Sequence, residues 1–321
     1  MLDPQARQLL DLIASLNLPP ARVLGVTQTR QNYRERRNAT QPGRLEMAQV
    51  TDHHLAIDGR SLLIRDYRPR SLAVRQALSG ESSAVPGLVY LHGGGWTIGD
   101  VDTHDTLCRA LADAAQCAVF SVDYRLGPEH RFPAAVLDAD HAFQWLIGEA
   151  DRLGVDPARI AVGGDSAGGN LATVVSILAR DRGGPMPRFQ LLIYPATDQR
   201  AGADSHRRNG EGYLLTSDMM QWFREQYHAD ESEYLDWRAS PLLTPDLGGL
   251  PPALMIVAEF DPLVDEGRAY AARLNEAGVN TRVVSFDGQI HGFITMGRVI
   301  DAASDAIAVC ASGLRTAFLT A

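Results

Sequence analysis

The distribution of apolar and polar positions divides the chain into two kinds of segment. Short apolar or β-branched runs alternate with longer stretches in which apolar residues recur every three to four positions, the patterns of buried strands and amphipathic helices. The predicted strands lie at 62–67, 87–91, 118–122, 160–163, 189–194, 254–258 and 282–286, and the predicted helices at 104–115, 134–149, 167–181, 265–277 and 301–319. This alternation predicts an α/β fold in which helices cover both faces of a mostly parallel sheet.

Two segments depart from this alternation. The first 45 or so residues read as helical and rich in arginine, and they precede the predicted strands. After residue 194 the strand pattern stops, and a polar stretch at 199–212 leads to a predicted helix that begins at Thr216 or Ser217. In an open α/β sheet, ligands bind outside the carboxyl ends of the strands, so an insertion at this point would roof the ligand crevice.

Composition and charge narrow the classes of function. At 321 residues the chain allows two domains or one large α/β unit. Acidic residues (39) outnumber basic ones (30) for a net charge of −9, which argues against nucleic acid as a partner. All 30 basic residues are arginines, so Schiff-base chemistry, Ser-Lys dyads and the lysine of a phosphate-binding P-loop are excluded.

Cysteines and terminal segments bear on the cellular compartment. Cys108, Cys117 and Cys310 are widely spaced, which fits neither a disulfide framework nor a zinc site, and we expect them to be buried. The N-terminus lacks a basic region followed by a cleavable apolar stretch, and we find no span of about 18 apolar residues. We therefore expect a soluble, reduced, cytoplasmic protein.

The segment AVGGDSAGGN, at 161–170, carries the strongest candidate for chemistry. Its G-x-S-x-G motif stands between an apolar strand pattern and a helical pattern, which is the context of a nucleophile elbow. Such a turn would expose the Ser166 hydroxyl above the sheet and leave the backbone N–H of Ala167 free to stabilise negative charge. The motif also occurs by chance as a plain glycine-rich loop, but the flanking elements favour the elbow.

A second glycine-rich segment, HGGGW at 92–96, follows the predicted strand at 87–91. Consecutive glycines allow backbone N–H groups to face a ligand, as in loops that form an oxyanion hole. We assign the hole to the N–H groups of Gly94 and Gly95, joined by Ala167. The alternative is a phosphate-binding loop, but neither a G-x-G-x-x-G spacing nor a P-loop lysine is present.

A serine nucleophile needs a base and an orienting carboxylate, in the chain order serine, acid, histidine. Asp261 lies just past the predicted strand at 254–258, and His291 lies in the loop after the last predicted strand. Most other histidines fall in a strand-like segment, a helix or the insertion and have ordinary structural explanations. The acidic rivals of Asp261 are Asp287, which is the nearest competitor, and Glu259, Asp265 and Glu266, the last two in a first helical turn where they suit the helix dipole.

Six sequence boxes together resemble the hormone-sensitive-lipase-like family of microbial carboxylesterases, within the α/β-hydrolase superfamily, and among these the acetyl esterases. The boxes span most of residues 85–295, and the GDSAGG and HGGGW boxes at this separation are highly specific. They are YLHGGGW (90–96), VDYRLGPEHRFPAA (122–135), GDSAGGN (164–170), YPATD (194–198), DPLVDEG (261–267) and HGF (291–293).

The resemblance implies a single α/β-hydrolase domain over 1–321, with a helical cap contributed by about 1–45 and 199–240. It implies a set of site residues with three kinds of role. These are the triad Ser166, His291 and Asp261, the oxyanion hole of Gly94, Gly95 and Ala167, and the substrate-binding candidates Trp96, Met220 and Phe223, the last two of which would serve equally as packing of the cap.

The implied function is hydrolysis of short-chain acyl esters through an acyl-enzyme, with no metal and no cofactor. An amidase or deacetylase that uses the same triad is an alternative, because the carbonyl chemistry is shared. A non-catalytic small-molecule receptor is another, although receptors of this type typically lose the histidine. The expected partner is a small-molecule ester, with no nucleic acid and no membrane, and a homodimer is compatible with the sequence.

Overall fold

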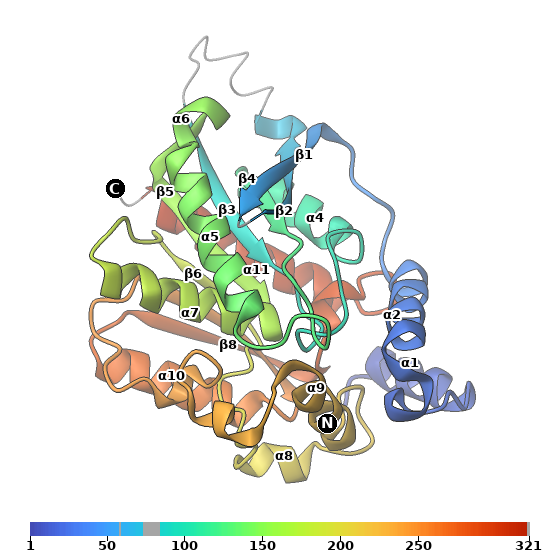
Figure 1. Cartoon of the computed structure of the whole chain (residues 1–321). Coiled ribbons are helices and arrows are strands. Elements are labelled where there is room, and N and C mark those ends of the chain that lie inside the picture. The colour runs from blue at the N-terminus through green and yellow to red at the C-terminus, as the bar shows by residue number, and fades with distance from the viewer. Residues whose placement is uncertain (58, 73–83, 320–321) are drawn as a thin grey trace.

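An eight-stranded sheet forms the centre of the molecule (Figure 1), in the order β1-β2-β4-β3-β5-β6-β7-β8. The computed structural model describes residues 1–57, 59–72 and 84–319. From β4 to β8 neighbouring strands are parallel, whereas β1 and β2 add an antiparallel edge, so the predicted α/β fold is confirmed. The strands are β1 (Met47–Ile57), β2 (Arg60–Pro69), β3 (Val85–Leu91), β4 (Ala118–Val122), β5 (Val155–Asp165), β6 (Gln190–Ile193), β7 (Ala253–Phe260) and β8 (Thr281–Ile290).

Helices cover both faces of the sheet (Figure 1), so its central strands are buried on both sides. Side chains of β3 alternate between two cores: Val89 faces the core beneath α5, α7 and α10, and Leu88 faces the core beneath α4 and α11. A strand buried on both faces is apolar throughout, which is why the central strands were predicted from short apolar runs. The covering helices are α4 (Asp105–Ala115), α5 (Ala134–Gly148), α6 (Ala150–Leu153), α7 (Ala167–Arg182), α10 (Val264–Glu276) and α11 (Ala302–Leu319).

The edge strand β1 was not among the predicted runs. Only one of its edges is paired, to β2, and most of its side chains are partly or fully exposed. Its sequence therefore includes the polar run Asp52, His53 and His54, which hides the apolar positions between them. A search for apolar runs is insensitive to such a half-buried edge.

The two segments outside the alternation are largely helical. They form α1 (Pro4–Ser15), α2 (Ala21–Thr40), α8 (Asp204–Arg208) and α9 (Ser217–Tyr227). The predicted start of α9 is confirmed, since the Thr216 hydroxyl caps the helix by accepting a bond from the Met219 N–H at 3.2 Å. The two segments meet where Arg22 of α2 donates to Glu225 of α9 at 2.8 Å.

Helix α11 corrects one expectation. By length and composition alone it is apolar enough to cross a membrane, although its sequence includes Asp305 and Arg315. In the structure it lies along one face of the sheet (Figure 1). Its buried positions recur every three to four residues. Those in the core beneath α4 are Ala306, Cys310, Ala311, Leu314 and Phe318.

Candidate active site

Ser166 stands on the tight turn between β5 and α7. Its backbone has φ 55° and ψ −115°, a conformation that costs a non-glycine residue free energy and persists only where the surroundings enforce it. The enforcement comes from both sides of the turn. The Ser166 N–H donates to the Ile193 carbonyl at 2.8 Å, and the Ser166 carbonyl accepts from the Asn170 and Ala196 N–H groups at 3.1 and 3.2 Å.

The glycines around Ser166 permit a close approach of three backbone segments. A Cβ on Gly168 would lie 1.8 Å from the carbonyl oxygen of Leu91, the last residue of β3, and one on Gly164 would lie 2.2 Å from the same oxygen. No side chain fits at either position. The G-x-S-x-G spacing is therefore required by the packing of β3 against the elbow.

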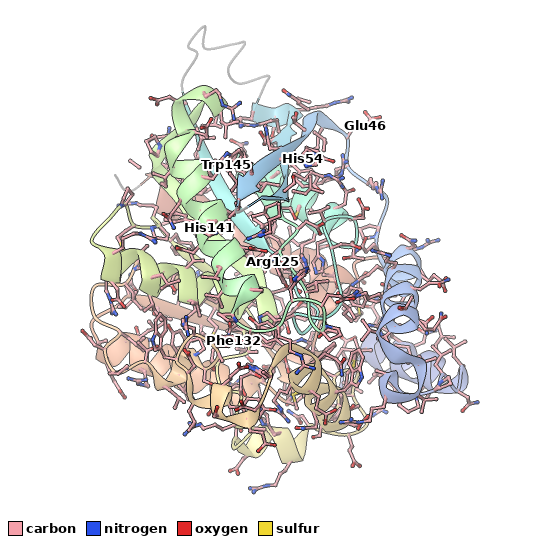
Figure 2. The ribbon with its side chains drawn as sticks, viewed as in Figure 1. Glu46, His54, Arg125, Phe132, His141 and Trp145 are labelled. Carbon is pink, nitrogen blue, oxygen red and sulfur yellow. The ribbon has the colours of Figure 1, made fainter. Side chains whose placement is uncertain are left out.

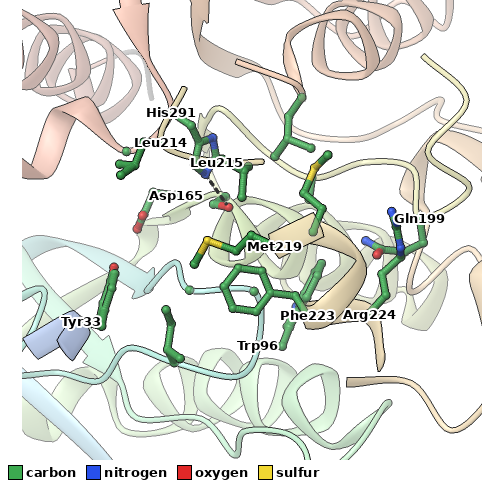
Figure 3. Close-up of a pocket in the computed structure, with 18 of the residues that line it drawn as sticks. Tyr33, Trp96, Asp165, Gln199, Leu214, Leu215, Met219, Phe223, Arg224 and His291 are labelled. Atoms are coloured by element: carbon green, nitrogen blue, oxygen red, sulfur yellow. Dashed lines mark hydrogen bonds between the residues drawn. The ribbon is translucent and has the colours of Figure 1, made fainter. Parts of the chain in front are cut away.

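His291 and Asp261 are brought to Ser166 from the ends of two neighbouring strands. His291 Nε2 lies 3.0 Å from Ser166 Oγ, as the dashed line in Figure 3 marks, and His291 Nδ1 lies 2.7 Å from Asp261 Oδ2. Asp261 is fully buried, and its other carboxylate oxygen accepts a bond from the Leu263 N–H at 2.8 Å. The ring of His291 also packs on Tyr194, with 4.6 Å between centroids.

The acidic rivals of Asp261 are engaged elsewhere. Asp287 accepts a bond from the Ser285 hydroxyl at 2.9 Å, and Glu259 accepts from the Gly288 N–H at 2.7 Å. Asp265 accepts from the Ser205 N–H at 2.9 Å. Among the carboxylates considered from the sequence, the one hydrogen-bonded to His291 is Asp261.

The glycine-rich loop after β3 lies beside Ser166. Gly94 and Gly95 have φ of 124° and 56°, and both line the same cavity as Ser166. The loop is tied to the elbow by Asp165, whose Oδ1 accepts from the Gly93 N–H at 3.0 Å and the Tyr90 hydroxyl at 2.8 Å. Asp165, next to Ser166 in the chain, thus ties the glycine-rich loop to the turn that holds Ser166.

Buried imidazoles complete the support of this loop. The His92 carbonyl accepts a hydrogen bond from the Tyr124 hydroxyl at 2.6 Å. The imidazole ring of His92 stacks on the Tyr124 ring, with 4.2 Å between centroids. Burial, together with the charge of His104, lowers the pKa of His92 to about 4. Burial alone would raise the pKa of Asp165, but His104, 3.4 Å away, holds it well below its ordinary value. An ionised Asp165 is therefore maintained beside neutral His92.

A cavity of about 90 Å³ opens at Ser166 (Figure 3). The predicted substrate-binding residues Trp96, Met220 and Phe223 all line it, and the Trp96 ring stacks on Tyr227 with 4.7 Å between centroids. Met219 of α9, which the sequence places beside Met220 as packing of the cap or a pocket wall, lines it too. Sequence reasoning did not assign most of the other lining side chains to a pocket, because they come from separate segments and share no spacing signal. They include Tyr33, Arg36, Arg37, Ile98, Asp198, Gln199, His206, Leu214, Leu215, Arg224, Leu263 and Glu266.

His206 of the insertion and Glu266, which lies in the first turn of α10 as predicted, meet in the structure. They form a buried pair on the cavity wall, with 2.7 Å between His206 Nε2 and Glu266 Oε2. Glu266 also accepts bonds from the Thr197 and Asp198 N–H groups at 2.6 and 3.1 Å. Burial by itself favours the neutral imidazole, but the Glu266 carboxylate raises the pKa of His206 above its ordinary value. The pair joins α8 of the insertion to α10 of the sheet layer.

Within residues 1–57, 59–72 and 84–319, no group of three or more His, Cys, Asp or Glu side chains is arranged to hold a metal ion.

Fold and site together define a class of protein. A mostly parallel sheet, a serine on a strained strand-to-helix turn and an HGGG loop beside it are the features of an α/β hydrolase. A family model described as "alpha/beta hydrolase fold" matches residues 88–295. The chain belongs to this family, the hormone-sensitive-lipase-like carboxylesterases.

Known relatives agree with this membership. The chain is 43% identical over 259 residues to an ethyl acetate hydrolase of Pseudomonas putida, which covers 80% of this chain and 79% of that protein. It is 39% identical over 287 residues to the carboxylesterase NlhH of Mycobacterium tuberculosis, covering 88% and 86%. Among solved structures, an ester hydrolase from the metagenome of Lake Arreo, complexed with a derivative of bipyridine phosphonate, has a TM-score of 0.93 at 41% identity over 100% of both chains.

Proposed function

We propose that the chain is a serine carboxylesterase that hydrolyses short-chain acyl esters, with Ser166 as nucleophile, His291 as base and Asp261 as its orienting carboxylate. The observation that carries the proposal is the continuous chain of hydrogen bonds from Ser166 Oγ through the His291 ring to Asp261. An imidazole in this position accepts the hydroxyl proton as the oxygen attacks, and the buried carboxylate stabilises the imidazolium that forms.

The proposed reaction has two halves. Ser166 Oγ bonds to the ester carbonyl carbon, the bond from that carbon to the alkoxy oxygen breaks, and the proton held by His291 passes to the leaving alcohol. Water then attacks the acyl carbon of the acyl-enzyme and gives its proton to His291. The bond from that carbon to Ser166 Oγ breaks, His291 returns the proton to Ser166 Oγ, and the acid is released. The N–H groups of Gly94, Gly95 and Ala167 bind the oxyanion in both halves. Removing such a donor from other enzymes costs about 3 to 4 kcal/mol of transition-state stabilisation.

Two observations support short acyl chains. The ring of Phe223 closes over the glycine loop, since a Cβ on Gly95 would lie 2.3 Å from that ring. A relative is named for hydrolysis of ethyl acetate. We propose small-molecule esters as partners and, from the sequence, a cytoplasmic location.

We also propose that residues 1–45 and 199–240 act together as one cap over a single α/β-hydrolase domain. In support, both segments contribute side chains to the cavity at Ser166, and Arg22 of α2 also pairs with Asp218 of α9 at 3.1 Å. Residues 320–321 and 73–83, which the domain range includes, lie outside the described residues.

The test of the function is Ser166→Ala, measured with p-nitrophenyl acetate. We expect a loss of at least about a thousandfold in kcat, because the residual rate of triad knockouts comes from the oxyanion hole and binding alone. The matched control is Ser176→Ala on α7, whose hydroxyl donates to the Ala172 carbonyl at 2.9 Å, and it should keep its activity. Retained activity in folded Ser166→Ala, or failure of the native protein to react with a fluorophosphonate, would refute the proposal.

A further inference from the structure

One end of the active-site cavity is built by α2, and it carries two arginines that the proposed reaction does not use. Tyr33, Arg36 and Arg37 line the cavity together with Ser166. Figure 3 shows Tyr33 projecting into the cavity on the side of the His291–Ser166 bond away from Arg224. The cavity therefore extends past Ser166 toward α2.

Arg37 is buried with unused hydrogen-bond donors. Arg37 is only 5% exposed. Its guanidinium carbon lies 4.6 Å from the centroid of the Tyr33 ring, and its Nη2 donates a hydrogen bond to the Tyr33 hydroxyl. Its Nε and Nη1, both buried, have no hydrogen-bond partner among the described residues. Unpaired buried donors on a cation are costly, so native proteins rarely keep them without a use.

Arg36 places a second cation against the same ring. Its guanidinium carbon lies 5.5 Å from the Tyr33 centroid, and its buried Nε also lacks a partner among the described residues. Burial, and then the like charge of Arg37, lowers the pKa of Arg36 to about 10. Both guanidiniums are still charged at neutral pH, and a bound anion would relieve their repulsion.

Asp165 and Arg224 line the same cavity, and neither is hydrogen-bonded to Arg36 or Arg37. Asp165 attracts Arg37, but its carboxylate already accepts bonds from Tyr90 and Gly93. Arg224, at the other end of the cavity, has partners that Arg36 and Arg37 lack. It donates to Gln221 Oε1 at 2.8 Å, and the carboxylates of Glu225, Glu231 and Glu266 act on its charge. The unpaired positive charge is thus confined to the α2 end.

We propose that Arg36 and Arg37 form a carboxylate-binding subsite, and that the preferred substrates are esters that carry a second, ionised carboxylate. The inference rests on the proposed esterase function, which places the ester group at Ser166. A guanidinium presents its N–H groups as a planar fork that matches a carboxylate. The free carboxylate would accept from the unused N–H groups of the two arginines while the ester carbonyl lies at Ser166.

The experiment compares each charged ester with a neutral ester of the same shape. One arm uses monoethyl glutarate and its carboxamide, ethyl 4-carbamoylbutanoate, in which the charge lies on the acyl part. The other arm uses 4-acetoxybutanoate and 4-acetoxybutanamide, in which it lies on the alcohol part. We expect kcat/KM to be about tenfold or more higher for the carboxylate than for the carboxamide in one arm, because hydrogen bonds to a charged group at a buried site contribute about that much. The arm that shows the preference identifies which part of the substrate reaches α2.

Variants assign the preference to the arginines. Arg36→Gln and Arg37→Gln should each reduce the ratio of kcat/KM on the carboxylate to kcat/KM on the carboxamide toward one. The matched control is Arg34→Gln, also on α2, whose exposed side chain pairs with Asp100 at 2.7 Å, and it should keep the native ratio. If Arg37→Gln does not fold, Arg36→Gln and competitive inhibition of the native enzyme by glutarate, compared with its neutral diamide, give the same information.

The outcomes separate the subsite from the function. Equal or better rates on the carboxamide in both arms, or a carboxylate preference that survives both arginine variants, would overturn the subsite and leave the esterase intact. If the native protein hydrolyses none of the four esters and does not hydrolyse p-nitrophenyl acetate, the proposed function is refuted, and the subsite with it.

Discussion

At the scale of single residues, the site depends on backbone positions as much as on side chains. Ser166 is held at positive φ by hydrogen bonds on both sides of its turn, and the space for that turn exists because Gly164 and Gly168 lack a Cβ. The geometry of the proposed nucleophile therefore depends on glycines that take no part in the proposed reaction, and changing one of them should lower the stability of the fold.

Gly168→Ala tests this dependence. The added methyl would meet the Leu91 carbonyl at 1.8 Å, so α7 must move away from β3, and we expect a loss of about 3 kcal/mol or more in the free energy of unfolding, at the upper end of overpacking. Urea denaturation measures it. Gly148→Ala on α5 is the control, since nothing lies within 4 Å of its added Cβ, and it should be neutral or slightly stabilising. A native-like Gly168→Ala would contradict the close approach.

At the scale of elements, the loop between β4 and α5 is fixed by one buried carboxylate. Asp138 of α5 is fully buried and accepts bonds from the Arg125 N–H at 3.0 Å, from its guanidinium at 2.9 Å, and from Arg60 of β2. Figure 2 shows Arg125 beside α5. Arg125, which belongs to the VDYRLGPEHRFPAA box, therefore binds within the fold and does not line the cavity at Ser166.

Asp138→Asn should weaken this clamp severely. The change leaves two guanidiniums facing a neutral amide inside the protein, and breaking a buried ion pair typically costs about 3 to 5 kcal/mol. The control is Asp140→Asn, two residues further along α5, where the carboxylate pairs with Arg182 at 2.9 Å nearer the surface, and about 1 kcal/mol or less is expected. Equal melting temperatures for the two variants would show that the clamp contributes little.

At the scale of the whole molecule, neutral histidines buried at distant sites link folding to pH. Burial lowers the pKa of His228 from an ordinary value of 6.5 to about 4. Burial lowers the pKa of His92 to about 4 as well. Between these pH values the unfolded chain takes up protons that the folded protein does not bind. Stability should therefore fall as the pH drops from about 6.5 to about 4, by up to about 1.4 kcal/mol per pH unit for each such group.

His228→Gln should flatten this dependence by about one proton. The free energy of unfolding, measured by urea denaturation at several pH values between 6.5 and 4.5, should decline less steeply in the variant than in the native protein. His54→Gln on the exposed edge strand β1 is the control and should keep the native slope. Only the slope decides, because glutamine changes the packing against Phe132 and Tyr234 as well. A native slope in His228→Gln would contradict the buried neutral imidazole.

Most of the fold could be predicted because burial on two faces leaves a local trace. Central strands such as β4 (Ala118–Val122) are short apolar runs bounded by helices, and the observed bounds agree with the predicted ones to within a few residues. The edge strand β1 left no such trace, since it is half exposed. The apolar length of α11 also went unrecognised, because its isolated polar residues interrupt the run.

The sequence by itself determined the class of fold, the family, and the candidates Ser166, Asp261 and His291, because a strained turn and its glycines require particular residues in an unbroken local order. Only the tertiary structure decided which carboxylate contacts His291, that His206 pairs with Glu266 on the cavity wall, and that Arg36 and Arg37 reach the same cavity as Ser166. The physical reason is distance along the chain. These contacts join segments whose meeting depends on how helices pack at one end of the sheet, and no local pattern records that packing.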